Sequence, residues 1–168
     1  RRKSIPDALL AWKYFIDSLP KEKADKCLFI LHTELTSDHG TDLTAVHDYI
    51  FGEDDNTIIF STQKLSTVQM NYFYNLADAQ ILLSSAEGWG LSLTEALLTG
   101  TPFIANVTGG MQDQMRFEDE DGNWIDFDSE VPSNHTGAYQ KHGKWAFPVF
   151  PSNLSLVGSP QTPYIWDD

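Results

Sequence analysis

The sequence predicts an α/β fold built on a parallel sheet, and three observations lead to this prediction. Short apolar runs typical of strands alternate with helical patterns across residues 1–107, which is the pattern of a sheet covered by helices. Residues 79–107 follow the order strand, glycine loop, helix and strand, which makes a parallel βαβ unit. Apolar residues make up 41% of the 168, enough for one globular domain with a sizeable core.

Apolar spacing and helix caps predict the elements of the first half. Ser4 is a candidate N-cap with Pro6 near the first helical position, and the apolar pattern that follows ends at Pro20. Cys27 falls in the first predicted strand, where a core position is favoured over a nucleophile. The segments expected next are a strand at 27–32, a polar turn at 34–40, a weak helix at 41–50, an acidic turn at 52–56 and a strand at 57–61.

The second half contains the βαβ unit and then loses its regular pattern. A helix with an apolar and aromatic face is predicted at 66–77, followed by a buried strand at 79–83 and a strand at 102–107. Between those strands, Ser92-Leu93-Thr94-Glu95 fits a capping box, which gives Glu95 a purely structural interpretation. The later segments are an acidic run at 117–130, a polar loop at 134–143, a strand at 145–151 limited by prolines and a tail without clear periodicity.

The loop between strand 79–83 and the following helix has the composition of a ligand site. Ligands of such sheets bind at the carboxyl ends of strands, and Gly88 and Gly90 let the backbone approach a ligand where a Cβ would block it. The N–H groups at the start of the helix suit a phosphate. Glu87 and Glu95 bracket the loop and can accept hydrogen bonds from hydroxyl groups. Phosphate donors between two hydroxyl acceptors suit a sugar nucleotide.

These residues also resemble a known signature. Glu87, seven residues and Glu95, with Gly-Trp-Gly-Leu inside and Gly100-Thr101-Pro102 after, are similar to the motif of the retaining group 1 glycosyltransferases (family four). The usual form there is Glu-Gly-Phe-Gly-Leu, then Glu-Ala, then Gly-Thr-Pro. Residues 74–78 resemble the Tyr-x-x-Ala-Asp of that family. Residues 108–113 resemble its Gly-Gly-x-x-Glu, with Asp113 in place of glutamate. The resemblance runs from Lys3 to about Asp113 and then fades.

The resemblance implies a fold and a division of labour. It implies a Rossmann-like parallel sheet with helices on both faces, the C-terminal, donor-binding half of a GT-B enzyme. The whole enzyme would move a sugar from a nucleotide diphosphate sugar to an acceptor hydroxyl with retention of configuration. The acceptor would bind a missing N-terminal domain, so residues 1–168 would be a single-domain fragment that is inactive alone. Residues 1–113 would be its family-like core, and 114–168 a divergent excursion and tail.

The same resemblance assigns roles to individual residues. Glu87 would meet the donor sugar, Lys3 the donor phosphates and Glu95 the ribose hydroxyls. A second basic residue and its strand would lie upstream of Arg1. Arg1 and Arg2 can also be solvated loop charges, and this interpretation is favoured for Arg1. The expected donor-binding residues are Gly88, Trp89, Gly90, Leu91 and Glu95, and the further pocket candidates are Gly109, Gly110 and Asp113.

The acidic run and its aromatic neighbours are expected to avoid the donor. Carboxylates repel an anionic diphosphate at short range, so Glu118 to Asp121 should point outward or face the acceptor, well away from Glu87. The rings of Trp124, Tyr139 and Trp145 can offer flat faces to an acceptor sugar, although core packing is the favoured role of Trp145.

Composition excludes several classes of function. A net charge of −13 argues against nucleic-acid binding. No apolar run approaches the length of a membrane span, and the single cysteine fits a reducing, cytoplasmic compartment. No metal or cofactor is expected, because the candidate ligands fit no zinc spacing; they are His32, Glu34, Asp38, His39 and His47. Two alternatives stay open, a non-catalytic sugar-nucleotide binding module and a sugar-nucleotide epimerase of similar fold.

Overall fold

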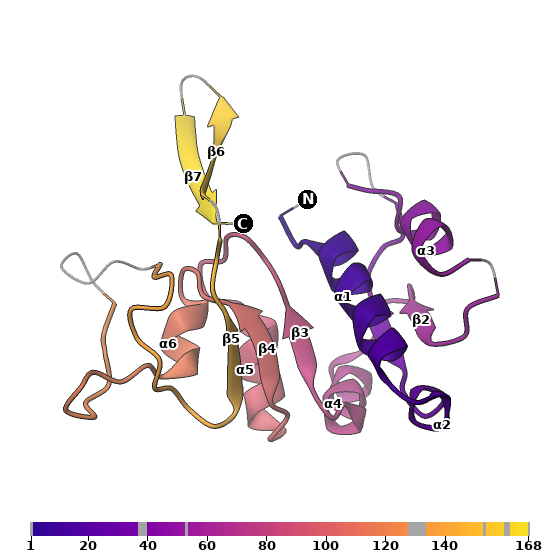
Figure 1. Ribbon diagram of the computed structural model, residues 1–168, viewed down its shortest axis with the longest axis horizontal. Helices are drawn as coiled ribbons and strands as arrows, with labels where there is room; N and C mark the ends of the chain where they lie inside the picture. The colour runs from indigo at the N-terminus through magenta and orange to yellow at the C-terminus, as the bar shows by residue number, and fades with distance from the viewer. Residues whose placement is uncertain are drawn as a thin grey trace. The chain divides into compact units, whose positions relative to one another are not determined.

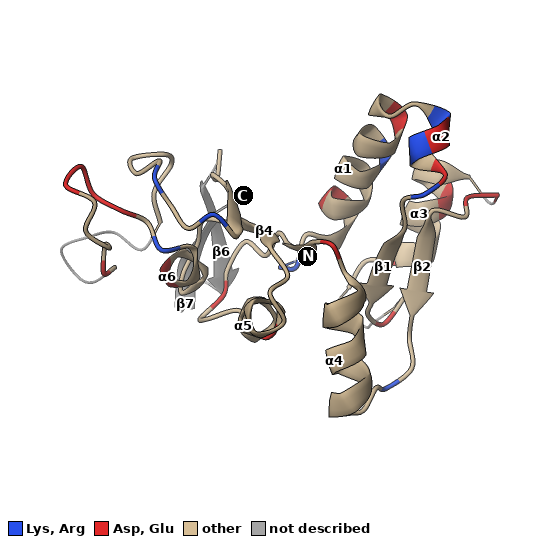
Figure 2. Cartoon of the chain, turned by 90° about the horizontal axis from the view of Figure 1, so that it is seen from below, with Lys and Arg blue, Asp and Glu red and all other residues tan. Residues whose placement is uncertain are grey.

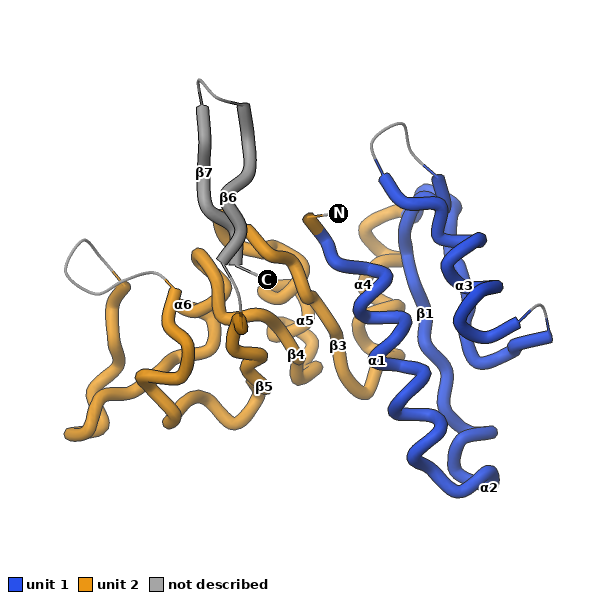
Figure 3. Tube along the Cα trace, turned by 45° about the horizontal axis from the view of Figure 1, so that its top comes forward, with its two compact units in different colours: residues 1, 3–65 blue, residues 2, 66–168 orange. Residues whose placement is uncertain are grey.

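The computed structural model describes residues 2–36, 40–52, 54–127, 134–152, 154–159 and 162–167. The chain forms two compact units, one of residues 1 and 3–65 and the other of residues 2 and 66–168 (Figure 3). Both units combine helices with parallel strands (Figure 1). The predicted α/β class with a parallel sheet is therefore confirmed.

Unit 1 contains a pair of parallel strands covered by helices. The strands are in register with Phe29 opposite Ile58. The indole of Trp12 lies 5.3 Å from the ring of Phe29 and donates a hydrogen bond to Thr57 Oγ1 at 3.1 Å, so the first helix contacts β1 and the residue that precedes β2. The elements are α1 (Ile5–Ser18), α2 (Lys21–Ala24), β1 (Phe29–His32), α3 (Leu43–Phe51) and β2 (Ile58–Ser61).

Three details of unit 1 differ from the sequence-based expectation. Ser4 precedes α1 but has a φ of 45° and its side chain makes no capping bond, whereas Asp42 caps α3 by accepting from the Thr44 and Ala45 amides. Cys27 lies before β1 and not inside it, with its thiol against the Lys23 carbonyl. The four-residue α2 was not predicted, because one helical turn is too short to show periodicity.

The proposed absence of a metal site rested on residues that the structure only partly describes. Asp38 and His39 lie outside the described residues. His47 contacts Asp48 Oδ1 at 2.9 Å and Asp55 Oδ2 at 3.4 Å. Among the described residues, no group of three or more histidine, cysteine, aspartate or glutamate side chains is arranged to hold a metal ion.

Unit 2 contains a three-stranded parallel sheet in the order β3-β4-β5 and a separate antiparallel pair, β6 and β7. Its core joins β4 to the helices on either side of it along the chain. The elements are α4 (Thr67–Leu76), β3 (Gln80–Leu82), α5 (Leu91–Leu98), β4 (Phe103–Asn106), α6 (Met111–Met115), β5 (Ala146–Val149), β6 (Leu154–Ser159) and β7 (Thr162–Asp167). The buried core residues are Leu93, Phe103, Ala105, Val107, Met111, Met115, Phe117 and Ala146.

Three features of unit 2 differ from the sequence-based expectation. The helix α4 begins at a capping box of Ser66 and Gln69 and has no buried residue, although the sequence suggested a strong apolar face. Pro148 lies within β5 and does not limit it. The tail, which showed no periodicity, contains β6 and β7. No helix in the described part of the chain is both long and apolar enough to cross a membrane.

Candidate functional site

Two loops of unit 2 meet backbone to backbone beyond the carboxyl ends of β3 and β4. These are the β3–α5 loop (83–90) and the β4–α6 loop (107–110). The Gly110 N–H donates to the Glu87 carbonyl at 3.3 Å. A Cβ at Gly109 would lie 1.9 Å from the Glu87 carbonyl oxygen, and one at Gly110 would lie 2.3 Å from the Gly88 carbonyl oxygen. Only glycine permits this approach, so Gly109 and Gly110 pack directly against the backbone of the β3–α5 loop.

Polar side chains at the end of β4 hold the β3–α5 loop from the same side. The Asn106 amide donates to the carbonyl oxygens of Leu83 at 3.1 Å and Ser84 at 3.3 Å. The Thr108 hydroxyl donates to the Ser85 carbonyl at 3.5 Å. Carbonyl groups buried at the start of the loop are thereby paired, and the chain reaches Glu87 along a fixed path.

Arg2 forms an ion pair with Glu87. Its Nη1 lies 2.8 Å from Glu87 Oε1 and donates to the Ala86 carbonyl at 2.8 Å. The Arg2 carbonyl accepts from the Ser85 amide at 2.9 Å. The Glu87 side chain is 12% exposed and that of Arg2 is 43% exposed. A largely buried carboxylate thus has a cation beside it, which offsets part of its desolvation.

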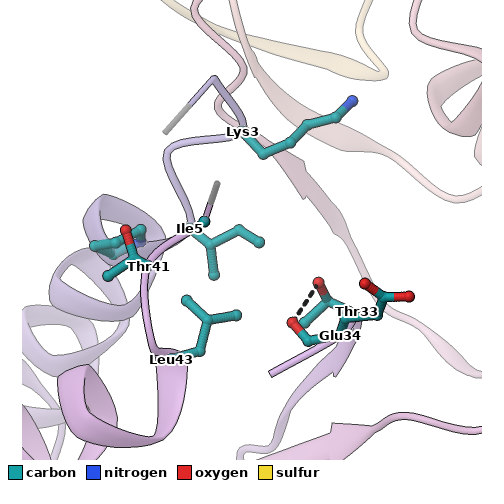
Figure 4. Close-up of a pocket in the computed structure, with 8 residues that line it drawn as sticks. Lys3, Ile5, Thr33, Glu34, Thr41 and Leu43 are labelled. Atoms are coloured by element: carbon teal, nitrogen blue, oxygen red, sulfur yellow. Dashed lines mark hydrogen bonds between the residues drawn. The ribbon is translucent and has the colours of Figure 1, made fainter. Parts of the chain in front are cut away.

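Lys3 belongs to unit 1 and lines a hollow of about 340 Å³ there. Thr33 and Glu34, which follow β1, form another wall, and Thr33 Oγ1 donates to the Glu34 carbonyl at 3.3 Å (Figure 4). Ile5, Pro6, Gly40, Thr41 and Leu43 complete the lining. Lys3 and Glu34 are the two charged residues of this lining, which therefore carries no excess positive charge.

The helix α5 begins at Leu91, with Gly90 as its N-cap at φ 79°. Ser92 therefore lies inside the first turn, and the capping-box interpretation of Glu95 is wrong. Glu95 Oε2 instead accepts a 2.6 Å hydrogen bond from the Tyr74 hydroxyl. Burial, and then the bond to Glu95 and its charge, raise the pKa of Tyr74 far above its usual value. A carboxylate has about four acceptor sites, so Glu95 retains capacity for a ligand hydroxyl.

Gln114 of α6 joins the β3–α5 loop to α5. Its Nε2 donates to the carbonyl oxygens of Trp89 and Gly90, and its Oε1 accepts from Thr94 Oγ1 at 2.9 Å. The same Thr94 oxygen accepts from Trp89 Nε1 at 2.8 Å. The Gln114 carbonyl accepts from Trp145 Nε1 at 3.0 Å. Trp89, a predicted site residue, is thus held at both its backbone and its indole.

Asp113, the third pocket candidate, lies in α6 and is coupled to the chain that follows. Burial first and the charge of Asp126 second raise the pKa of its carboxyl, while Arg116 acts in the opposite direction. The Arg116 guanidinium lies 4.4 Å from the centre of the Trp124 ring, a cation–π contact. The electrostatic partners of Asp113 therefore belong to the excursion. The excursion also contacts the β4–α6 loop, because Asn134 Oδ1 accepts a hydrogen bond from the Gly109 amide at 2.9 Å.

The excursion after α6 is organised by an aromatic cluster that the sequence did not reveal. The imidazole of His135, 7% exposed, lies 4.5 Å from the Phe117 ring and 5.1 Å from that of Tyr139, measured between ring centres. Phe127 stacks on the same imidazole. Burial lowers the pKa of His135 below its ordinary value. A polar loop by sequence is thus a small core by structure.

Four acidic residues of the excursion, Glu118 to Asp121, follow one another in a single loop. Asp119 accepts hydrogen bonds from the Asn123 amide and side chain, and backbone and side-chain bonds from Asn123 hold its pKa below the usual range. Figure 2 shows this acidic loop beyond α6, on the side away from α5. Residues 128–133, which include the rest of the acidic run, lie outside the described residues.

Parts of this chain are similar in sequence to known proteins. Residues 54–131 match the family model of glycosyl transferases group 1. The chain is also 32% identical over 68 residues to a trehalose synthase of Rubrobacter xylanophilus. That similarity covers 40% of this chain and 16% of the relative, so the chain spans a small part of the protein it resembles. Both matches support a glycosyltransferase domain.

The group 1 match contains most of the predicted site residues, and the structure adds others to them. Glu87, the glycine loop, Glu95 and the Gly109-Gly110 pair lie within 54–131, whereas Lys3 lies before it. Sequence reasoning missed three residues that contact this set, which are Arg2, Tyr74 and Gln114. The basic Arg1-Arg2-Lys3 run was a visible signal for Arg2. Nothing in the spacing pointed to Gln114.

Proposed function

We propose that this chain is the donor-binding part of a retaining group 1 glycosyltransferase of GT-B architecture. The observation that carries the proposal is the open backbone at Gly88, inside the group 1 match and beside the start of α5. A Cβ built on Gly88 meets nothing within 4 Å, and Gly88 is exposed, while Glu87 next to it is held by Arg2. Backbone that is rigidly supported on one side and open on the other suits a ligand that needs close contact.

The proposed roles follow from the chemistry of each group. The diphosphate would lie at Gly88 to Leu91, where the first amides of the eight-residue α5 lack intrahelical acceptors. Glu87 would accept hydrogen bonds from the donor sugar, and Glu95 from the ribose. Lys3 would contribute a cation to the phosphates. Charge that develops on the leaving diphosphate would be stabilised by these donors, which are already oriented before the reaction.

The transfer itself would need a second domain that supplies the acceptor hydroxyl. In this proposal residues 1–168 are one donor-binding domain, with 1–113 as the family-like core and 114–168 as a divergent excursion and tail. Positioning of the donor by Glu87 and Glu95 would then contribute to the rate by holding the reacting carbon near the acceptor.

The first test is a titration of the 15N-labelled chain with UDP, GDP and ADP. We expect amide shifts concentrated at Gly88 to Leu91, because those N–H groups face the proposed diphosphate. If none of the three nucleotides shifts this loop, the proposal is wrong. Assaying the full-length gene product for sugar transfer and for epimerisation separates a transferase from an epimerase, and binding without either activity would indicate a binding module.

The second test is Glu95→Gln, with Tyr74→Phe as its matched control. Glutamine keeps an oxygen for the Tyr74 hydroxyl but loses the charged acceptor, so nucleotide binding should weaken by ~1–3 kcal/mol with little loss of fold stability. Tyr74→Phe removes the protein partner and leaves the carboxylate for the ribose, so affinity should persist. Unchanged affinity in Glu95→Gln together with a lower melting temperature would mean that Glu95 only supports Tyr74.

A further inference from the structure

We propose that Gln114 is a positioning residue for the donor loop. Its buried amide would hold the peptide groups of Trp89 and Gly90 in the orientation that presents the N–H groups of Gly90 and Leu91 to a diphosphate. The inference rests on the proposed function, since it assigns a role within the same site. Gln114 lies in α6 and is 24 residues from Gly90 in sequence.

The hydrogen-bond partners of Gln114 fix the orientation of its side-chain amide. Trp89 Nε1–H donates to Thr94 Oγ1, so the Thr94 hydroxyl proton is free to donate to Gln114 Oε1. The two N–H groups of Nε2 then face the carbonyl oxygens of Trp89 and Gly90. Gln114 is 6% exposed. A reversed amide would place its oxygen against two carbonyl oxygens in a buried site, so this orientation is strongly favoured.

Peptide geometry converts this contact into an orientation of donors. In a trans peptide the C=O and the following N–H point in opposite directions. Drawing the carbonyl groups of Trp89 and Gly90 toward Gln114 therefore turns the N–H groups of Gly90 and Leu91 away from it. Leu91 is the first residue of α5, so its N–H has no acceptor within the helix. Both donors are thus directed away from α6.

Flexibility of the loop explains why such a support matters. Gly88 and Gly90 lack side chains, and glycine has more backbone freedom to lose than any other residue. If that freedom were lost only when a ligand binds, affinity would fall by the corresponding free energy. A buried side chain that fixes the two peptide groups in the free protein removes this cost beforehand.

The central experiment replaces Gln114 with methionine, which has a similar length and no amide. We expect the dissociation constant of the tightest binder among UDP, GDP and ADP to rise roughly tenfold, as the loss of ~1.4 kcal/mol would produce. Phe127→Leu is the matched control, because Phe127 packs in the aromatic cluster away from these bonds. It should lower the melting temperature without changing the dissociation constant.

A second variant, Gln114→Glu, separates hydrogen bonding from packing. An ionised carboxylate still accepts from Thr94 but cannot donate to the two carbonyl groups. At pH 8 its affinity should therefore be no better than that of Gln114→Met. At low pH the protonated carboxyl regains one donor, so its affinity relative to Gln114→Met should recover. A role in packing alone would give no such pH profile.

The outcomes distinguish this inference from the proposed function. If Gln114→Met binds the nucleotide within about twofold of the wild-type protein, or weakens only as much as Phe127→Leu, the positioning role is wrong. If the wild-type chain binds none of the nucleotides, the proposed function fails. In that case, backbone 15N relaxation at Gly88 to Leu91 tests whether Gln114 orders the loop. Loss of order in Gln114→Met supports the positioning role, and unchanged order overturns it.

Discussion

Two regions of unit 2, the meeting point of the β3–α5 and β4–α6 loops and the aromatic cluster of the excursion, are stabilised by different kinds of contact. Where the β3–α5 and β4–α6 loops meet, the contact is made by backbone atoms, and glycines leave no room for a side chain. In the excursion, the contact is made by rings packed around Phe117 and His135. The first region therefore tolerates no added atom, whereas the second is sensitive to lost volume and to buried charge.

Among the variants that test this difference between the two regions, we expect Gly109→Ala to lower the free energy of unfolding most. The new methyl group would overlap the Glu87 carbonyl oxygen, and Gly109 has a φ of +49°, so the loops must separate. We expect the free energy of unfolding to fall by ~3 kcal/mol or more in urea titrations. Gly122→Ala is the control, since its φ is +84° but nothing lies within 4 Å of the added atom. Equal losses in the two variants would show that backbone strain, and not the loop contact, decides.

The second prediction concerns the aromatic cluster. Because burial lowers the pKa of His135 below 6.5, the unfolded chain takes up this proton first as the pH falls. Stability from His135 is therefore complete above about pH 6.5 and decreases below it, by ~1 kcal/mol per pH unit or less. Between about pH 7.5 and 5.5 the melting temperature of the wild-type protein should therefore fall relative to that of His135→Leu. Parallel curves would mean that burial does not lower the pKa of His135 in the folded protein.

Tyr74→Phe measures how much a single side-chain hydrogen bond, from Tyr74 to Glu95, contributes to stability in comparison with the backbone contacts of the loops. Loss of the hydroxyl bond to Glu95 should cost ~1 kcal/mol. The pKa of Tyr74 is raised in the folded state, so its contribution is complete below pH 10 and is lost as the pH rises above that value. The wild-type protein should therefore lose stability more steeply than the variant as the pH rises above about 10. Equal slopes would contradict the shift.

The smallest effect is expected from Arg2→Ala, which removes a partly exposed side chain from the edge of the same loop. Because the Arg2 side chain is 43% exposed, water can replace much of its interaction with Glu87, so the loss should be ~1 kcal/mol or less, and salt screens the pair. Thermal unfolding at low and high ionic strength should show a difference between variant and wild type that shrinks with salt. A large, salt-independent loss would place Arg2 with the glycines as an essential part of the loop contact.

The sequence predicted the βαβ unit well because its determinants are local. Strand 102–107 and the helix that precedes it are marked by Gly100, by Pro102 and by apolar spacing, and the structure has them as β4 and α5. The pairing of Glu87 with Arg2 is different, because 85 residues separate the partners. Gln114 and Gly90 are likewise joined only by the fold.

The capping box shows how a local pattern can mislead. Ser92 and Glu95 have the right spacing, but the positive φ of Gly90 starts the helix earlier and leaves both inside it. The excursion failed for another reason. Its aromatic residues are scattered among polar ones, so no period marks them as a core, and His135 gains its neighbours only when the chain closes on itself.

Pro148 affects whether a strand of another molecule can pair with the outer edge of β5. The carbonyl groups of Trp145 and Val149 accept hydrogen bonds from β4, so the alternate positions of β5, Ala146 and Pro148, turn their backbone toward the opposite edge. Pro148 has no N–H to offer there, and the Ala146 N–H is already bonded to Gly143. A strand from another molecule would find no free donor at either position. Both positions therefore lack a donor for edge-to-edge pairing, and Pro148→Thr, which adds one, should make this chain more prone to aggregate.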